Sequence, residues 1–139
     1  MDCIFCKIAE NEAEAEILYE NENVVSFLDI NPMNYGHALV ISRNHYDNLL
    51  DVPVNELGGL MEAVQVVAAA IKNSLNPDGI NIVANNGRAA GQSVFHFHFH
   101  VIPRFNDDEF KFRLNLKKYE IGLKKEFADK IRSAVLSGG

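Results

Sequence analysis

Residues 95–102 read Phe-His-Phe-His-Phe-His-Val-Ile, an alternation of apolar side chains and histidines. Successive side chains of a β-strand point to opposite faces. The alternation therefore predicts a strand over residues 94–102, with His96, His98 and His100 sharing one face. The other face is expected to lie in the hydrophobic core and consists of Phe95, Phe97, Phe99 and Val101.

Three imidazoles in a row serve no packing purpose, although a solvent-exposed histidine tract is an alternative. Residues i and i+4 of a strand lie roughly 13 Å apart, whereas a zinc ligand lies within about 2.1 Å of the ion. At most two neighbouring histidines can therefore share one metal. At least one is left for proton transfer or nucleophilic attack, which suits a group with a pKa of about 6.5.

The elements around this strand follow an α+β order. Short strands are predicted at 17–19, 24–29, 37–42 and 80–84, and the tight turns between the first three favour an antiparallel meander. Apolar residues at helical spacing predict a long helix over 54–75. A four-residue apolar repeat predicts a C-terminal helix and consists of Leu123, Phe127, Ile131 and Val135.

Length and composition fit one globular domain over residues 1–139, with 47% apolar and 23% charged residues. The net charge of −6 disfavours nonspecific binding to nucleic acid. Nine of the thirteen Lys and Arg residues lie in 104–139, so the C-terminal part is basic and the rest acidic. No secretory signal and no apolar run of about 20 residues is evident, so we expect a soluble cytoplasmic protein without membrane contact.

The loop before the histidine strand favours phosphate binding. Gly87 and Gly91 allow backbone N–H groups to form an anion-binding nest, and Gln92 and Ser93 add neutral donors. The loop has the spacing of neither a P-loop nor a Rossmann fingerprint. The prediction of phosphate binding is strengthened because the loop lies a few residues before a row of histidines.

Residues 96–102 resemble the His-x-His-x-His-x-x motif of the histidine triad (HIT) family of nucleotide hydrolases and transferases. Segments similar to those of the family occur in the same order at 3–8, 27–32, 36–41, 85–87 and 90–93. The resemblance covers roughly residues 3–104 and leaves 105–139 as a C-terminal extension. It implies the HIT fold: a sheet of about five antiparallel strands with one long helix, continued across a homodimer.

The resemblance also implies the roles of individual residues. His98 is the expected nucleophile, which attacks the α-phosphorus and forms a nucleotidyl-histidine intermediate; His100 and His37 are expected to set its tautomer and contact the phosphate. Asp29 is expected to accept the ribose hydroxyls. The implied phosphate and leaving-group contacts are Asn85, Gly91, Gln92 and Ser93. The implied slot for the base, whose members also fit an ordinary core, is formed by Ile4, Phe5, Ile8, Phe27, Leu28 and Ile30.

The resemblance points to hydrolysis of a purine nucleoside phosphoramidate. The family's galactose-1-phosphate uridylyltransferase branch has glutamine where this chain has His100, so water is the expected final acceptor. The Cys-Ile-Phe-Cys opening at 3–6 is similar to the Hint-like branch and its bacterial relatives. A Fhit-like dinucleoside polyphosphate hydrolase, suggested by the ending at 101–104, and a nucleotide-binding module with little turnover are the alternatives.

Cys3 and Cys6, the two cysteines of the chain, cannot form a disulfide framework and indicate a reducing compartment. A thioredoxin-like role would need a strand before them. A closed zinc site needs two more ligands, and we expect His45, just past the 37–42 strand, and His96. Some bacterial HIT proteins resemble this arrangement. Two buried free thiols, or histidines held by hydrogen bonds alone, are the alternatives, and no organic cofactor is expected.

The 54–75 helix carries more apolar surface than one core face needs. Val66, Ala69 and Ala70 widen its apolar arc, and a five-stranded sheet leaves edges to cover. Together with the resemblance, this predicts a homodimer. The alternative is a helix buried on two sides within one chain.

Overall fold

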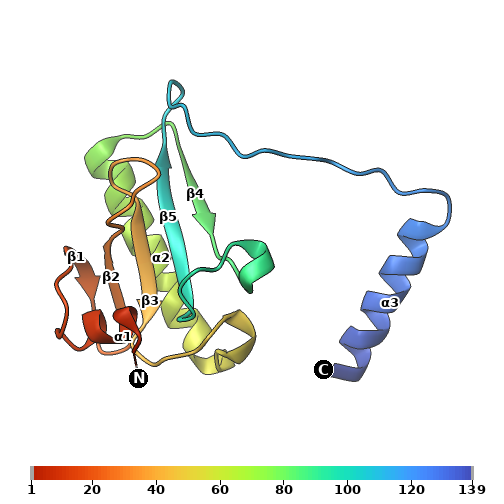
Figure 1. Ribbon diagram of the computed structural model, residues 1–139, viewed down its shortest axis with the longest axis horizontal. Coiled ribbons are helices and arrows are strands. Elements are labelled where there is room, and N and C mark those ends of the chain that lie inside the picture. Colours follow the sequence, from red (N-terminus) through yellow and green to blue (C-terminus); the bar gives the residue numbers. More distant parts are fainter. Residues whose placement is uncertain (1, 139) are drawn as a thin grey trace.

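In the computed structural model, which describes residues 2–138 and their side chains as far as residue 135, five antiparallel strands form one sheet. Their spatial order is β1-β2-β3-β5-β4 (Figure 1). The strands are β1 (Ile17–Glu20), β2 (Val24–Leu28), β3 (Ala38–Ser42), β4 (Gly79–Val83) and β5 (His98–Arg104). The predicted α+β class and five-stranded antiparallel sheet are confirmed.

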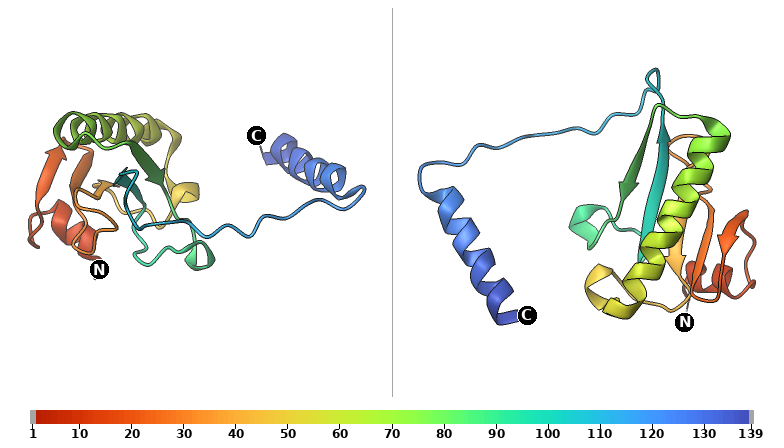
Figure 2. Two further views of the ribbon diagram at one scale, coloured as in Figure 1. Left: turned by 90° about the horizontal axis from the view of Figure 1, so that it is seen from above. Right: turned by 180° about the vertical axis from the view of Figure 1, so that it is seen from behind.

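Both faces of the central strands are covered, as the two helices on opposite sides of the sheet in Figure 2 show. α2 (Val54–Leu75) packs on one face, where Val40 and Val101 join its apolar cluster. The short helix α1 (Ile4–Ala9) packs on the other face, over Leu39 and Ile41. β3 is therefore buried at every position. The histidine row lies on the α1 side, so it is enclosed by the N-terminal segment.

The histidine strand begins later than expected, at His98. Residues 94–96 form a bend, and the N–H of the next residue, Phe97, donates to the Tyr46 carbonyl at 2.7 Å instead of joining the sheet. Phe95 is 36% exposed and lies 5.4 Å beneath the Arg88 guanidinium. The prediction that Phe95 lies in the core is therefore wrong, because strict alternation does not extend into the bend.

The sequence pattern gave no indication of α1, whose six residues are too few to display helical periodicity. The Cys3 side chain caps its first turn by accepting the Cys6 N–H at 3.4 Å. Arg43 holds the other end by donating to the Ala9 carbonyl at 2.6 Å. α1 is thus fixed by contacts at both ends rather than by its own propensity.

α2 has the predicted bounds, and its buried residues recur at helical spacing: Leu60, Ala63, Val64, Val67 and Ile71. It is also the one helix within residues 2–138 that is long and apolar enough to cross a membrane, by length and composition alone. Its buried stripe packs on the sheet as that of a core helix does. The outward face stays exposed and includes Met61 and Val66.

Beyond β5 the chain leaves the sheet. We call residues 105–138 the C-terminal arm: an extended stretch followed by α3 (Leu123–Gly138). The arm departs on the β4 side, and α3 stands apart from the sheet in all three views (Figures 1 and 2). The apolar stripe of α3 is exposed, with Phe127 at 47% and Ile131 at 63%.

Candidate active site

A cavity of about 460 Å³ lies between α1, the end of β2 and the start of β5. It brings together all six apolar residues expected to form the base slot: Ile4, Phe5, Ile8, Phe27, Leu28 and Ile30. Asp29, Ser93, His98 and His100 line the same cavity. The cavity therefore combines an apolar wall with a carboxylate, a hydroxyl and two imidazoles.

The tautomer of His98 follows from one hydrogen bond. Its Nδ1 lies 2.7 Å from the carbonyl oxygen of His96, and because a carbonyl can only accept, Nδ1 carries the proton. Nε2 of the neutral ring is then unprotonated and keeps a free lone pair, as a nucleophile requires. The edge-on Phe5 ring, with its centroid 5.1 Å from that of His98, fixes the plane of the imidazole. The expectation that His37 and His100 set this tautomer is wrong, because the main chain sets it.

A second chain of hydrogen bonds fixes His37 and His100. The Met33 N–H donates to Nδ1 of His37 at 3.1 Å, so the His37 proton sits on Nε2. From there it is donated to Nδ1 of His100 at 2.9 Å. Neutral His100 consequently keeps its proton on Nε2, as a donor within the cavity that its ring lines. His37, only 1% exposed, lies behind His100 rather than in the cavity wall, where a phosphate contact was expected.

Burial keeps these imidazoles neutral near pH 7. Desolvation lowers the pKa of His98, against the opposing effects of its hydrogen bond to the His96 carbonyl and of the Asp29 carboxylate. Desolvation also lowers the pKa of His37, against the opposing effect of Asp29. Burial, followed by the neighbouring His98 and His37 rings, lowers the pKa of His100 to about 4. At physiological pH the site therefore holds two neutral imidazoles, His98 with a bare Nε2 and His100 with an Nε2–H donor.

The glycine loop is closed on itself. Gly87 and Gly91 have φ values of +92° and +98°, and their N–H groups donate to the Gln92 side chain and the Arg88 carbonyl. The buried Gln92 amide donates both hydrogens to main-chain carbonyls, those of Asp47 and Val94. The expected anion nest at these two glycines and the expected substrate contact of Gln92 are therefore wrong. Gln92 braces the loop.

Of the donors predicted in this loop, Ser93 reaches the cavity. Asn85 and Gly91 do not line the cavity, although they lie together. A Cβ placed on Gly91 would be 3.6 Å from the Asn85 amide nitrogen. Their predicted roles would thus require a ligand that extends beyond this cavity.

The structure gathers the four predicted metal ligands at the base of α1. Sγ of Cys3 lies 3.4 Å from Nδ1 of His96, and Sγ of Cys6 lies 3.4 Å from Nδ1 of His45. All four ligand atoms lie within 4.8 Å of one another. Tetrahedral zinc, with bonds of about 2.0–2.3 Å, needs ligand separations of this order.

The outer nitrogens of both histidines are fixed as in metal sites. Nε2 of His96 donates to the Ser42 carbonyl at 2.7 Å, and Nε2 of His45 donates to the Asp47 carboxylate at 3.1 Å. Each ring therefore turns a bare Nδ1 toward the thiols. Such outer hydrogen bonds typically accompany histidine ligands, so the donor set fits zinc.

A second trio, Asp29, His37 and His100, is equally close-set. Coordination through Nε2 of neutral His37 would require the proton on Nδ1, where the Met33 N–H already donates. Two donors would then face each other. The trio consequently fits a hydrogen-bond relay better than a metal site.

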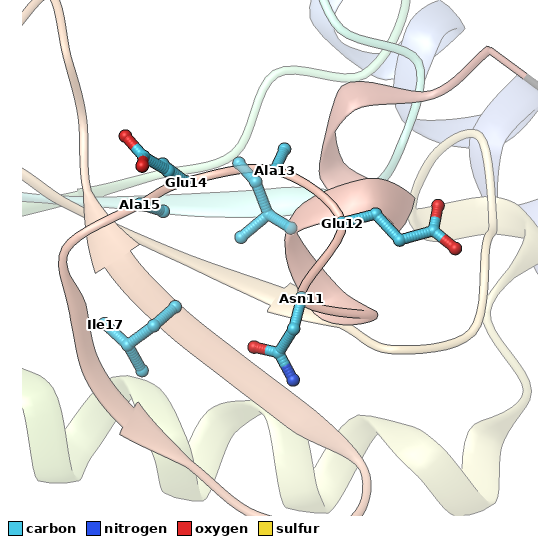
Figure 3. A pocket seen from close by; sticks show the side chains of 7 residues that line it. Asn11, Glu12, Ala13, Glu14, Ala15 and Ile17 are labelled. Atoms are coloured by element: carbon cyan, nitrogen blue, oxygen red, sulfur yellow. The ribbon is translucent and has the colours of Figure 1, made fainter.

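A smaller hollow of about 290 Å³ lies between the loop after α1 and β1 (Figure 3). It shares Ile8, Glu14 and Ala15 with the main cavity. Its polar lining consists of Asn11, Glu12 and Glu14, and carboxylates repel a phosphate. A phosphate would therefore be repelled from this hollow and would be better accommodated at the histidine end of the main cavity.

Several residues that line the cavity were not predicted from the sequence: Glu14, Ala15, Asn31, Leu39 and Val94. Leu39 was predictable, because it alternates with Ala38 and Val40 in an expected strand. The contact of the Met33 N–H with His37 was not predictable, because a backbone N–H is present whatever the residue type.

Residues 10–107 match the HIT domain, so the chain belongs to the HIT family. A HIT-like protein of Methanocaldococcus jannaschii is 49% identical over 106 residues, which cover 76% of this chain and 81% of the relative. Adenylylsulfatase HINT3 of Arabidopsis thaliana is 37% identical over 125 residues, which cover 90% of this chain and 64% of the relative.

Solved structures share the fold. A HIT family member from Bacillus subtilis superposes with a TM-score of 0.90 at 35% identity, covering 96% of each chain. A zinc-bound histidine triad family protein from Mycobacterium smegmatis superposes with a TM-score of 0.76 at 40% identity, covering 96% of this chain and 98% of its own.

Acidification is expected to destabilise the fold. Burial lowers the pKa of four histidines, His37, His96, His98 and His100. Below about pH 6.5 the unfolded chain binds protons that the native state excludes, so the free energy of unfolding falls as the pH falls toward 4. Urea titrations at pH 7.5 and 5 measure this loss. His100→Asn should show a smaller loss, and a free energy that is constant or higher at pH 5 would contradict the argument.

Proposed function

We propose that the chain is a nucleotide hydrolase acting on the α-phosphate of a purine nucleoside phosphoramidate or a related nucleotide conjugate. The observation that carries the proposal is the bond from His98 Nδ1–H to the His96 carbonyl, which leaves Nε2 bare in a ring that lines the cavity. Nε2 attacks phosphorus, a P–N bond to His98 forms, and the bond to the leaving group breaks. Water then cleaves the nucleotidyl-histidine and restores His98.

The cavity supplies a place for each part of such a substrate. The apolar wall accepts the base, and Asp29 accepts the ribose hydroxyls. The Asn31 N–H donates to Oδ1 of Asp29 at 2.8 Å and so orients the carboxylate. At the phosphate, the Nε2–H of His100 and the hydroxyl of Ser93 serve as donors to the charged oxygens and the leaving group.

The family relationship supports this class of reaction and leaves the leaving group open. The Arabidopsis relative is called an adenylylsulfatase, so nucleotide sulfates join phosphoramidates as test substrates. Diadenosine polyphosphates test the Fhit-like alternative. A chain that binds nucleotides but forms no covalent intermediate would fit the binding-module alternative.

Replacing His98 by Ala is expected to lower kcat by at least a thousandfold, because the covalent route is lost, while nucleotide binding persists. Steady-state turnover of adenosine phosphoramidate and calorimetric binding of AMP measure the two effects. In His98→Gly, added imidazole should partly restore turnover by entering the vacated space. Residual activity above about a tenth of wild type, only ~1.4 kcal/mol, would refute the nucleophile assignment.

We further propose that Cys3, Cys6, His45 and His96 hold one structural zinc ion. The ligand geometry and the zinc-bound Mycobacterium smegmatis relative support it. Burial and the neighbouring Cys3 raise the pKa of Cys6 to about 11, and a bound cation would offset this by stabilising the thiolate. The ion would anchor α1 and with it the base slot, without contact with the phosphorus.

Protein purified without chelator should contain about one zinc ion per chain by elemental analysis. The Cys3→Ser/Cys6→Ser variant should lose it, with a lower Tm and a higher KM, because the slot residues of α1 are released. His100→Ala, which alters the second trio, should keep the ion. Metal-free protein with unchanged Tm would contradict the proposal.

We also propose a cytoplasmic homodimer that binds neither nucleic acid nor membranes. Support for pairing comes from the exposed outer face of α2 and from edge strand β4, where Ile82 is 42% exposed. A second copy beside β4 would continue the sheet and pair the α2 faces. The arm leaves on this same side (Figure 1). The apolar stripe of its helix α3 is exposed.

Light scattering at micromolar concentration should report twice the chain mass of 15.5 kDa. Ile82→Asp places a charge at the proposed junction and should give monomers. Leu18→Asp on the opposite edge, where Leu18 is 46% exposed, should leave the mass unchanged. A wild-type monomer, or equal behaviour of both variants, would exclude this interface.

A further inference from the structure

The root of the C-terminal arm is tied down by a charged cluster outside the cavity. Arg104 binds Asp108 through two parallel hydrogen bonds, Nε to Oδ2 at 2.9 Å and Nη2 to Oδ1 at 3.0 Å. Its third nitrogen donates to Asn81 on β4 at 2.7 Å. The Phe110 ring lies 4.5 Å from the guanidinium carbon. Such a bidentate pair fixes direction as well as distance.

Asp108 also holds a residue 74 positions earlier in the chain. The Asn34 side-chain amide donates to Oδ2 of Asp108 at 3.0 Å and to the Pro103 carbonyl at 2.9 Å. Both of its hydrogens are thereby used. The Phe105 N–H donates to the same Asp108 oxygen at 2.9 Å. Asn34 is thus tethered between the end of β5 and the arm.

Asn34 belongs to the turn that presents His37. Its carbonyl accepts the His37 N–H at 3.0 Å, and Gly36 within the turn has φ +95°. A Cβ on Gly36 would come within 2.5 Å of the Leu75 side chain, so the turn is pressed against α2. Met33, next to Asn34, supplies the N–H that donates to Nδ1 of His37.

We infer that Asn34 and Asp108 are positioning residues for His37: their hydrogen bond holds the Met33 N–H on Nδ1 of His37 and so selects the Nε2–H tautomer. That tautomer in turn makes His100 an Nε2–H donor in the cavity. Neither Asn34 nor Asp108 lines the cavity. Asp108 lies just beyond the matched HIT domain, which ends at residue 107, so the arm contributes to a site otherwise built by the domain.

The inference about the tautomer stands on the hydrogen bonds alone, whereas its effect on turnover rests on the proposed function. The test compares Asn34→Ala and Asp108→Ala with Asp107→Ala, a neighbouring exposed carboxylate as control. Long-range ¹H–¹⁵N NMR of the histidine side chains reads the tautomer directly, and kinetics on adenosine phosphoramidate read the consequence.

Wild type and Asp107→Ala should show His37 as the Nε2–H tautomer. Asn34→Ala and Asp108→Ala should show a mixture of tautomers, with kcat lowered about tenfold and KM changed less than twofold, as expected for a lost hydrogen bond. The double variant should be no worse than the more severe single variant, since both break one tether.

Folded Asn34→Ala with the wild-type tautomer at His37 would overturn the inference. If Asp108→Ala does not fold, because Arg104 also depends on it, Asn34→Ala alone decides. A tautomer change in a protein whose wild type hydrolyses no nucleotide conjugate would refute the proposed function and leave the positioning role intact.

Discussion

The hydrogen bond between Nδ1–H of His98 and the carbonyl oxygen of His96 links the cavity to the cluster of two cysteines and two histidines beside it. His96 presents its side chain to the two thiols and its main chain to the neighbouring cavity histidine. Whatever fixes His96 therefore fixes the tautomer of His98. The bond from His96 to the Ser42 carbonyl does so from β3, and a zinc ion on Nδ1 would do so from α1. The proposed zinc site and the proposed nucleophile would therefore be coupled through His96 without direct contact.

The two faces of β5 and of the residues just before it have different roles. Alternation buries Phe97 and Val101 against α2 and leaves the same strand region with histidines toward α1. A buried imidazole is normally destabilising when charged, but here desolvation favours the neutral form that a nucleophile needs. The same burial that stabilises the fold through its apolar face therefore sets the chemistry of the polar face.

The sequence predicted most of what rests on side-chain type and period. The strands, the long helix and the apolar wall of the cavity follow from alternation, helical spacing and the family resemblance. The predicted burial of Phe95 was wrong because a bend interrupts the alternation. α1 was not predicted because six residues are too few to show a helical period. The predicted substrate contact of Gln92 was wrong for a different reason. Its amide can donate to a phosphate or to main-chain carbonyls, and only the fold shows which of these partners it meets. The His96 carbonyl and the Met33 N–H set the tautomers of His98 and His37. Every residue type has such a carbonyl and all but proline such an N–H, so the sequence gives no sign of these contacts.

The main chain holds His98 as a neutral ring with its proton on Nδ1, and the proposed chemistry depends on this state. The most direct measurement is the ¹⁵N chemical shift of both His98 ring nitrogens in the resting protein at pH 7, assigned with the His98→Asn variant. We expect a protonated Nδ1 and a bare Nε2. A His98 protonated on Nε2, or on both nitrogens, would contradict the claim.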